Sequence, residues 1–263
     1  MPPLVRIRSG RDQMSAIERR IAAFILENSI LLRDYSSQQL ASALGISQSS
    51  VVKFSQKFGF KGYPDLKYSI GEAAARQGNG QPATPPEALP ATDAYTRVQD
   101  ELRRSKLAAD EETSLINPRE KVEPIIELVD QAGKVFVCGL GDDGLIAREF
   151  AMRLSLLGLL TIHHADPILM MSNLSAARRG DVLLMVSEFG KLPEISQLSR
   201  QFQACEGKVV SITRNTSNPL RAHADASLVV SAHDPAPHVE HVLYRSSLQA
   251  LLDFVVVRLC QHN

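Results

Sequence analysis

The chain has 263 residues, of which 44% are hydrophobic, so it can bury one large core or two ordinary ones and does not read as a disordered protein. Its 29 Lys and Arg residues balance 29 Asp and Glu residues overall. The balance hides an asymmetry, because residues 1–80 hold eleven basic against six acidic residues, and residues 81–263 hold the opposite excess. A basic first segment favours a polyanionic partner for that part of the chain alone.

Apolar runs and cysteines narrow the protein class further. The longest apolar run, Leu154 to Ile162, is about half as long as a membrane span, and the first residues lack the apolar stretch of a signal peptide. The three cysteines, Cys138, Cys205 and Cys260, are widely separated and odd in number, which predicts neither a disulfide framework nor a CxxC metal site. We therefore expect a cytoplasmic protein that makes no contact with a membrane.

Residues 1–76 carry the signals of an all-α domain. Ser15-x-x-Glu18 and Ser36-x-x-Gln39 are capping boxes, and each predicts the start of a helix. Two further helices are predicted after them. The second helix would end at Gly45. A third would be capped by Ser47 and run to about Phe58, with Gly59 closing it, and a fourth would cover about Asp65 to Ala75.

The segment that begins at the second capping box has the spacing of a helix-turn-helix. Ala41 is small where the two helices would cross, and Gly45 stands where the turn needs a positive φ. The second helix would enter the major groove of DNA, where Gln48 can bond adenine bidentately and lysines suit phosphates. The alternative is a pair of ordinary solvated helices joined by glycine. The predicted DNA-contacting residues are Ser37, Ser47, Gln48, Ser49, Ser50, Lys53, Lys57 and Lys61.

A linker is predicted at residues 77–93, where Gly, Pro and Ala dominate and apolar periodicity is lost. Residues 94–263 begin with a long polar helix and then alternate apolar, strand-like runs with helical patterns. This alternation predicts a doubly wound α/β domain with a parallel sheet. The predicted strands begin at Val135, Leu159, Asp181, Lys208 and Ala226, and the predicted helices cover about 94–114, 144–157, 167–177, 193–204 and 239–260.

The first of these strands is followed by GxGxxG, from Gly139 to Gly144, and Asp166 follows the next strand. This pattern alone is the fingerprint of a dinucleotide-binding domain, which would make the protein a redox-responsive repressor. A lone GxGxxG is a weak signal, however, and Asp142 and Asp143 put negative charge where the phosphates would lie. The dinucleotide site is therefore the alternative rather than our first interpretation.

The run SQSSVVKFSQKFGFKGYPDLK, Ser47 to Lys67, resembles the N-terminal domain of the RpiR/MurR family of bacterial regulators, and the resemblance extends over essentially the whole chain. Members of that family join a helix-turn-helix domain to a sugar isomerase (SIS) domain, which is a phosphosugar-binding fold. The resemblance implies a double-stranded DNA operator and a small-molecule effector, such as a phosphosugar, as partners. It also implies a homodimer or homotetramer that holds no cofactor and no metal.

The resemblance places the effector at the loops after the first and third strands. Asp143 stands where the family has a serine, and Phe189 replaces a hydroxyl residue of the second loop, so the usual set of phosphate-binding residues is altered. Three outcomes stay open: a phosphosugar, a non-phosphorylated ligand, or no ligand. The implied ligand-binding residues are Gly139, Gly141, Asp142, Asp143, Ser187, Glu188, Gly190 and Thr213.

Other chemistry is weighed against this interpretation. A sugar isomerase would need a positioned base, for which Glu188 or Glu194 could be nominated, but no acid–base pair stands out and we expect no catalysis. His238 and His241 are spaced like metal ligands, yet no third ligand accompanies them in the sequence. The closing helix is apolar over a wide face, which fits either a domain core or a subunit interface.

Overall fold

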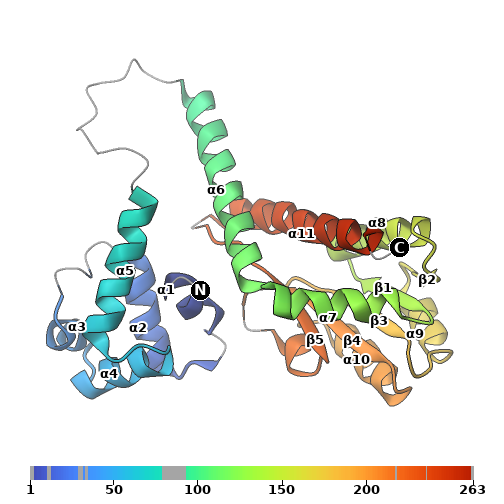
Figure 1. Ribbon diagram of the computed structural model, residues 1–263, viewed down its shortest axis with the longest axis horizontal. Helices are drawn as coiled ribbons and strands as arrows, with labels where there is room; N and C mark the ends of the chain where they lie inside the picture. The colour runs from blue at the N-terminus through green and yellow to red at the C-terminus, as the bar shows by residue number, and fades with distance from the viewer. Residues whose placement is uncertain are drawn as a thin grey trace. The chain divides into compact units, whose positions relative to one another are not determined.

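The computed structural model (Figure 1) divides the chain into two compact units, Met1–Gln99 and Asp100–Asn263. Most of the predicted linker, residues 79–92, lies outside the described residues. The structure describes residues 3–10, 13–28, 32, 35–78, 93–216, 218–234 and 236–261.

The first unit is built from helices, as its capping boxes predict. The Ser15 hydroxyl accepts the Glu18 amide at 3.3 Å, the Glu18 carboxylate accepts the Ser15 amide at 2.6 Å, and Ser36 and Gln39 make the same pair of bonds. A short first helix was not predicted, because its seven residues are too few for a clear helical pattern. The helices are α1 (Pro3–Ser9), α2 (Ala16–Glu27), α3 (Ser37–Leu44), α4 (Gln48–Lys57) and α5 (Tyr63–Gly78), and α6 (Ala94–Ile116) begins in this unit.

One apolar cluster holds these helices together. The rings of Phe54 in α4 and of Phe58, which follows the helix, contact each other with centroids 4.8 Å apart, and Tyr63 donates a hydrogen bond to the backbone oxygen of Tyr35 at 3.0 Å. Burial of side chains of this size contributes about 1.5–3 kcal/mol each, which offsets the entropy lost in ordering short helices. Fully buried members of the cluster are Ile7, Ile21, Ile25, Leu40, Val51, Phe54 and Leu66.

The second unit alternates strands and helices, as predicted. A helix that was not predicted, α7, carries Val122, Ile125, Ile126 and Val129 at helical spacing, a signal that the sequence does contain. The short 3₁₀ helix η3 (Pro219–Ala222) was not predicted either, and the other elements lie close to their predicted positions. They are β1 (Val135–Gly139), α8 (Asp142–Leu156), β2 (Thr161–Ile162), α9 (Pro167–Leu174), β3 (Val182–Val186), α10 (Pro193–Ala204), β4 (Lys208–Arg214), β5 (Ala226–Val230) and α11 (Pro237–Cys260), with α7 at Arg119–Asp130.

The five strands form a parallel sheet in the order β2-β1-β3-β4-β5. The register pairs Gly139 with Val186, so β1 and β3 end side by side. The strand order reverses direction between β1 and β3, and ligands of open α/β sheets bind at the carboxyl ends of the strands at such a reversal. The topology thus confirms the doubly wound domain and brings the two predicted ligand loops together.

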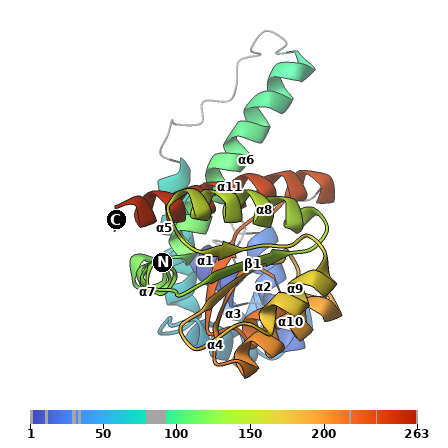
Figure 2. The ribbon, with the colours of Figure 1, turned by 90° about the vertical axis from the view of Figure 1, so that its right-hand side faces the viewer.

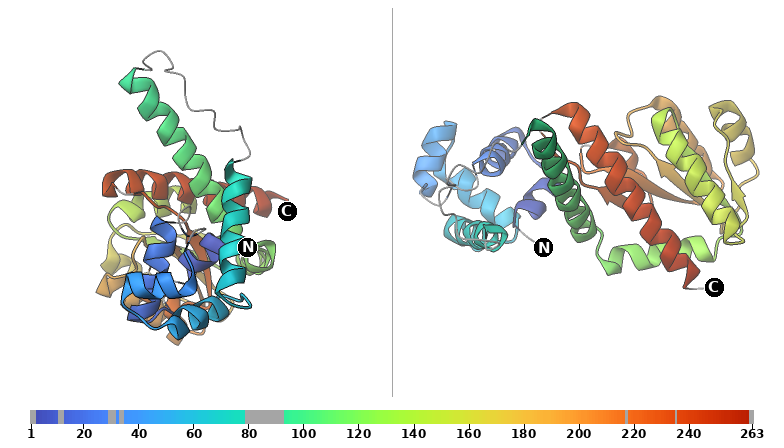
Figure 3. Two further views of the ribbon diagram at one scale, coloured as in Figure 1. Left: turned by 90° about the vertical axis from the view of Figure 1, so that its left-hand side faces the viewer. Right: turned by 90° about the horizontal axis from the view of Figure 1, so that it is seen from above.

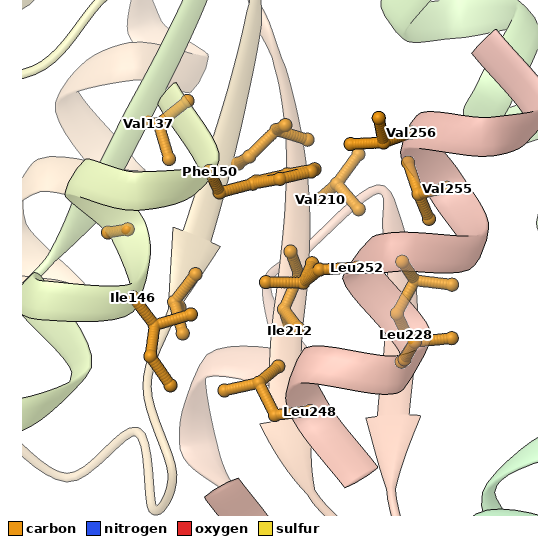
Figure 4. Packing of buried hydrophobic residues seen from close by; sticks show 14 of the residues in the cluster. Val137, Ile146, Phe150, Val210, Ile212, Leu228, Leu248, Leu252, Val255 and Val256 are labelled. Atoms are coloured by element: carbon orange, nitrogen blue, oxygen red, sulfur yellow. The ribbon is translucent and has the colours of Figure 1, made fainter. Parts of the chain in front are cut away.

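Helices cover both faces of the sheet, as Figure 2 shows, with α8 and α11 on one side and α9 and α10 on the other. In Figure 3 (right), α8 and α11 run side by side. Figure 4 shows Phe150 of α8 pointing towards Val210 of β4, and Leu252 of α11 lying beside Ile212 of the same strand. Successive residues of each strand point to opposite faces of the sheet. Because helices cover both faces, both sets of residues are buried, and the strands are continuous apolar runs in the sequence. Among the helices that the structure describes, none combines the length and the apolar character of a membrane span.

Candidate functional site

The helix-turn-helix of the first unit is formed by α3 and α4. Leu40 and Ala41 of α3 and Val51 and Phe54 of α4 are buried where the two helices pack. Gly45 ends α3 with φ 59° and ψ 42°, and a Cβ atom at this residue would meet nothing within 4 Å. Glycine is therefore required there by the left-handed backbone rather than by space.

The N-terminal turn of α4 presents a row of short polar side chains. The Ser47 hydroxyl caps the helix by accepting the Ser50 amide at 3.3 Å. It also lies 2.9 Å from the Ser49 hydroxyl and 2.8 Å from the Ser50 hydroxyl. Each hydroxyl has one donor and two acceptor positions, so the three serines keep capacity for a partner outside the chain.

Gln48 is exposed and is held from the neighbouring helix. Its Nε2 donates a hydrogen bond to the Ser37 hydroxyl at 2.8 Å. A glutamine amide has two N–H donors and one carbonyl acceptor, so one N–H and the oxygen remain unused. Those two groups are the pair that bonds adenine N7 and N6 in the major groove. The structure thus brings two predicted DNA-contacting residues, Ser37 and Gln48, together at the start of the two helices.

The three predicted lysines differ in their surroundings. Lys53 is exposed and, among the described residues, faces no acidic partner. Lys57 instead donates to the Gln13 carbonyl at 2.8 Å and pairs with Glu18 at 2.9 Å. The hydrogen bond from Lys57 to the Glu18 carboxylate is the main reason that the pKa of Glu18 is lowered. Lys61 is exposed, and its backbone amide is used by Asp65 at 2.8 Å.

The predicted ligand loops of the second unit follow β1 and β3. A Cβ atom at Gly139 would lie 2.6 Å from the carbonyl oxygen of Asp143, so the first turn of α8 packs directly on the end of β1. Gly141 takes a positive φ of 60° just before the helix starts. This tight turn sets Asp142 and Asp143 at the N-terminus of α8, beside the second loop.

Asp143 joins the two loops. Its Oδ2 accepts the backbone amide of Glu188 at 2.8 Å, and its Oδ1 accepts the Tyr244 hydroxyl at 3.4 Å. Burial raises the pKa of the Asp143 carboxyl, and the Glu188 and Asp142 carboxylates add to this rise. The hydrogen bonds from Glu188 and Tyr244 oppose it. Burial also raises the pKa of the Tyr244 hydroxyl.

Arg214, at the end of β4, is the buried cation of this region. Its guanidinium donates to Glu188 Oε1 at 3.1 Å and to the Ala232 carbonyl at 2.8 Å, and it pairs with Glu240 at the start of α11. The Arg214 side chain is only 6% exposed and that of Glu188 11%. A buried guanidinium needs such carboxylate partners, because an unpaired charge in this surrounding would be costly.

His241 and Arg245 of α11 extend the network to the surface. His241 Nδ1 lies 3.3 Å from Glu188 Oε2, and its Nε2 lies 3.0 Å from Asp142 Oδ2. Arg245 pairs with Asp142 at 2.8 Å. A cleft of about 630 Å³ between α6, α8 and α11 borders this end of the network. His241 thus reaches the loops of its own chain.

The remaining predicted ligand residues are close by but mostly engaged. The Ser187 hydroxyl accepts the Gly190 amide at 3.1 Å. Gly190 has a φ of 60°, and a Cβ atom there would lie 1.9 Å from Asn218 Oδ1, so this glycine is required by both backbone and space. The Thr213 hydroxyl is fully buried and has no hydrogen-bond partner among the described residues.

Three members of the network on α11, Glu240, Tyr244 and Arg245, were not predicted from the sequence, whereas His241 was considered there together with His238. Glu240 and Tyr244, and likewise His241 and Arg245, lie one turn apart at the start of α11, so a helix starting at Pro237 would have grouped them. Arg214 carried no such signal, because only the folded sheet brings the end of β4 to the second loop.

The rival chemistries can be compared with this geometry. Asp166, the acid of the dinucleotide fingerprint, caps α9 by accepting the amides of Ile168 and Leu169 at 2.8 and 2.9 Å. Its Oδ1 thus serves as the cap of a helix. Within the described part of the chain, no group of three His, Cys, Asp or Glu side chains is placed to hold a metal ion. Most apolar residues of α11 are buried in the domain core, while Val242, Phe254 and Val257 stay exposed.

Comparisons with protein families agree with this division of the chain. Residues 1–77 match the model for the "Helix-turn-helix domain, rpiR family", and residues 128–256 match the model for the SIS domain. The chain is 30% identical over 263 residues to the HTH-type transcriptional regulator YfhH of Escherichia coli strain K12, covering all of this chain and 93% of that protein.

Solved structures show the same fold at lower identity. The Vibrio vulnificus NanR protein complexed with ManNAc-6P matches with a TM-score of 0.57 and 24% identity, over 99% of this chain and 92% of its own. The sugar isomerase domain of an RpiR transcription factor from Sphaerobacter thermophilus matches with a TM-score of 0.55 and 18% identity, over 63% and 91%. The c3406 protein of E. coli CFT073, solved as a ligand complex, matches with a TM-score of 0.52 and 21% identity, over 66% and 93%.

Proposed function

Because the chain belongs to the RpiR family of helix-turn-helix transcriptional regulators and carries a SIS domain, we propose that α4 reads a specific DNA operator and that the SIS domain senses a sugar, a sugar phosphate or a related metabolite. The observation that carries the proposal is the exposed start of α4, where Ser37 holds Gln48 with one N–H and one carbonyl oxygen unused.

DNA reading follows from the chemistry of that surface. Gln48 would bond an adenine edge, and Ser47, Ser49 and Ser50 would reach bases or phosphates near it. Lys53 and Lys61, both exposed, would contact phosphates. Lys57 would contribute less, because Glu18 and the Gln13 carbonyl hold its ammonium group.

A two-fold operator would require a homodimer or a higher oligomer. Leu145, Met152 and Leu156 form an exposed apolar row along α8, with 62%, 58% and 79% of their surface accessible. A symmetric contact between SIS domains through this row would pair two reading helices. Light scattering of the wild type and of Leu156→Asp tests this, since the variant should be smaller if the row is the interface.

Effector binding is supported by the position of the loops and by two structural neighbours. The loops after β1 and β3 lie at the reversal of strand order, where open α/β sheets bind ligands. NanR is described as complexed with ManNAc-6P, and the c3406 structure is likewise a complex with a ligand. A shift in the population of DNA-competent arrangements would connect the two units.

We propose sensing rather than catalysis at this site. Glu188, one of the two nominated bases, has Oε1 paired with Arg214 and Oε2 beside His241. A general base has to face the substrate proton, whereas these contacts direct both oxygens at groups of the protein. Turnover of hexose phosphate isomers by the purified protein is the assay that would overturn this part.

The DNA proposal is tested with duplexes selected from a random pool by the purified protein. Gln48→Ala should weaken binding to the selected site by about 1–3 kcal/mol and relax the preference for adenine at one position. Gln56→Ala, at the exposed C-terminal end of the same helix, is the matched control and should leave affinity within about 0.5 kcal/mol. Equal affinities for wild type and Gln48→Ala would sink the assignment.

A further inference from the structure

The end of β3 offers few free amide donors to a ligand. The Ser187 amide donates to the Ile212 carbonyl at 3.0 Å, the Glu188 amide to Asp143 at 2.8 Å and the Gly190 amide to the Ser187 hydroxyl at 3.1 Å. Loop amides and helix N-termini are the groups that hold phosphates in α/β domains. In this loop those three donors are spent on partners inside the chain.

Asp143 is the partner that a ligand would have to replace. Its carboxylate sits in the first turn of α8 and accepts an amide of the neighbouring loop, so it already occupies a place where an anion could be held by both loops. The packing of α8 on Gly139 fixes the distance between this carboxylate and the amide. A fixed intramolecular group has a high effective concentration, so a dissolved anion competes poorly with it.

The charges of the side chains around Asp143 also disfavour the binding of an anion. Three carboxylates, Asp142, Glu188 and Glu240, pair with two guanidinium groups and one imidazole, and a fourth, Asp143, bonds the Glu188 amide beside them. With the carboxylates ionised, the sum is negative whether or not His241 is protonated. Arg214 cannot turn to a new anion without breaking its buried pairs with Glu188 and Glu240.

We propose that the Asp143 carboxylate is the resident anion of this site and excludes a phosphate group, so that the effector bound at these loops is recognised without one. The inference rests on the proposed function, namely that the loops after β1 and β3 bind an effector. Asp143 is then the residue that determines specificity between phosphorylated and non-phosphorylated ligands.

The test is calorimetric titration of the full chain with glucose 6-phosphate, inorganic phosphate and glucose. Asp143→Ser shortens the side chain, so the Glu188 amide loses its acceptor and becomes free for a ligand. We expect this variant to bind glucose 6-phosphate at least about tenfold more tightly than the wild type, with inorganic phosphate competing. Asp143→Asn is the matched control, because its amide oxygen still accepts from Glu188, and it should gain less.

Two outcomes overturn the inference. In the first, the wild type binds glucose 6-phosphate and inorganic phosphate competes for the site. In the second, a folded Asp143→Ser variant does not bind glucose 6-phosphate. Affinity for the selected DNA, measured in parallel, separates this from the proposed function. If Asp143→Ser binds glucose 6-phosphate but its DNA affinity does not respond, the inference holds and sensing fails. If the wild type binds glucose 6-phosphate and its DNA affinity changes, sensing holds and the inference fails.

Discussion

The start of α4 and the loops after β1 and β3 are both polar surfaces at helix N-termini, yet they differ in how their groups are used. At α4, Gln48 has one internal hydrogen bond and keeps a donor and an acceptor free. At the loops, Asp143, Glu188 and Arg214 bond mainly to one another. A reading surface has to leave bonding capacity for its partner, whereas the loops form a closed network.

The comparison shows why the same local signal has different consequences in the two units. A helix N-terminus attracts anions through its free amides and its dipole. In α4 the cap is a neutral hydroxyl, Ser47, which suits an approach to negative DNA. In α8 the first turn carries two carboxylates, Asp142 and Asp143, which satisfy the helix without a ligand.

The largest expected effect is a loss of folding stability when the buried cation of the closed network, Arg214, is removed. Arg214→Met leaves the Glu188 and Glu240 carboxylates without their guanidinium partner, and breaking a buried pair in this way costs about 3–5 kcal/mol. Urea unfolding followed by circular dichroism measures the loss. DNA binding by the first unit should change far less under conditions where the variant is folded.

The matched control lies at the other end of the same strand. Lys208 pairs with Asp225 at 2.8 Å, but its side chain is 56% exposed. Lys208→Met should therefore cost less than about 1 kcal/mol. If Arg214→Met cost no more than this control, the network would not be the closed, buried structure that its geometry indicates.

The sequence was most informative where contacts are local. Capping boxes at Ser15 and Ser36, the cap at Ser47 and the left-handed Gly45 all depend on residues within four positions of one another, and all are confirmed. The alternation of strands and helices likewise predicted the parallel sheet. The family matches and the relative confirm the resemblance that GFKGYPDLK suggested.

The closed network could not be predicted in the same way, because its members are far apart in the sequence. Asp143 meets an amide 45 residues later, and Glu188 meets a histidine 53 residues later. The sequence placed negative charge at the loops but did not reveal that Arg214 would neutralise part of it. Pairings of this kind are set by strand register and helix packing rather than by local propensity.

Lys53 and Lys57 of α4 are expected to contribute differently to DNA binding. Lys53→Ala should weaken binding to all DNA sequences alike and reduce the slope of log K against log salt by about 1, because one phosphate contact is lost. Lys57→Ala should change this slope less and should instead lose a surface ion pair with Glu18, worth at most about 1 kcal/mol of stability. Equal slopes for the two variants would contradict the distinction between a free and an engaged lysine.

The smallest expected effect is a pH dependence that originates in Asp143. Its pKa is raised by burial, so the folded protein binds this proton more tightly than the unfolded chain does. The stabilisation from that proton is fully present below the ordinary Asp pKa of about 3.9 and is lost as pH rises through the folded pKa. Relative to Asp143→Asn, the wild type should therefore gain thermal stability as pH falls from 7 towards 4.5.

Asp225 provides the opposite sign for comparison. Burial alone would raise its pKa, but hydrogen bonds from Lys208, Val209 and Gln203 outweigh burial and lower it. The stability that the ionised Asp225 contributes is present above the ordinary Asp pKa. It is lost only as pH falls through the lower pKa of Asp225 in the folded protein. Between pH 7 and 4.5 the melting difference between wild type and Asp225→Asn should stay nearly constant. A constant difference for Asp143→Asn as well would mean that the Asp143 carboxylate is not held in a buried, negatively charged surrounding.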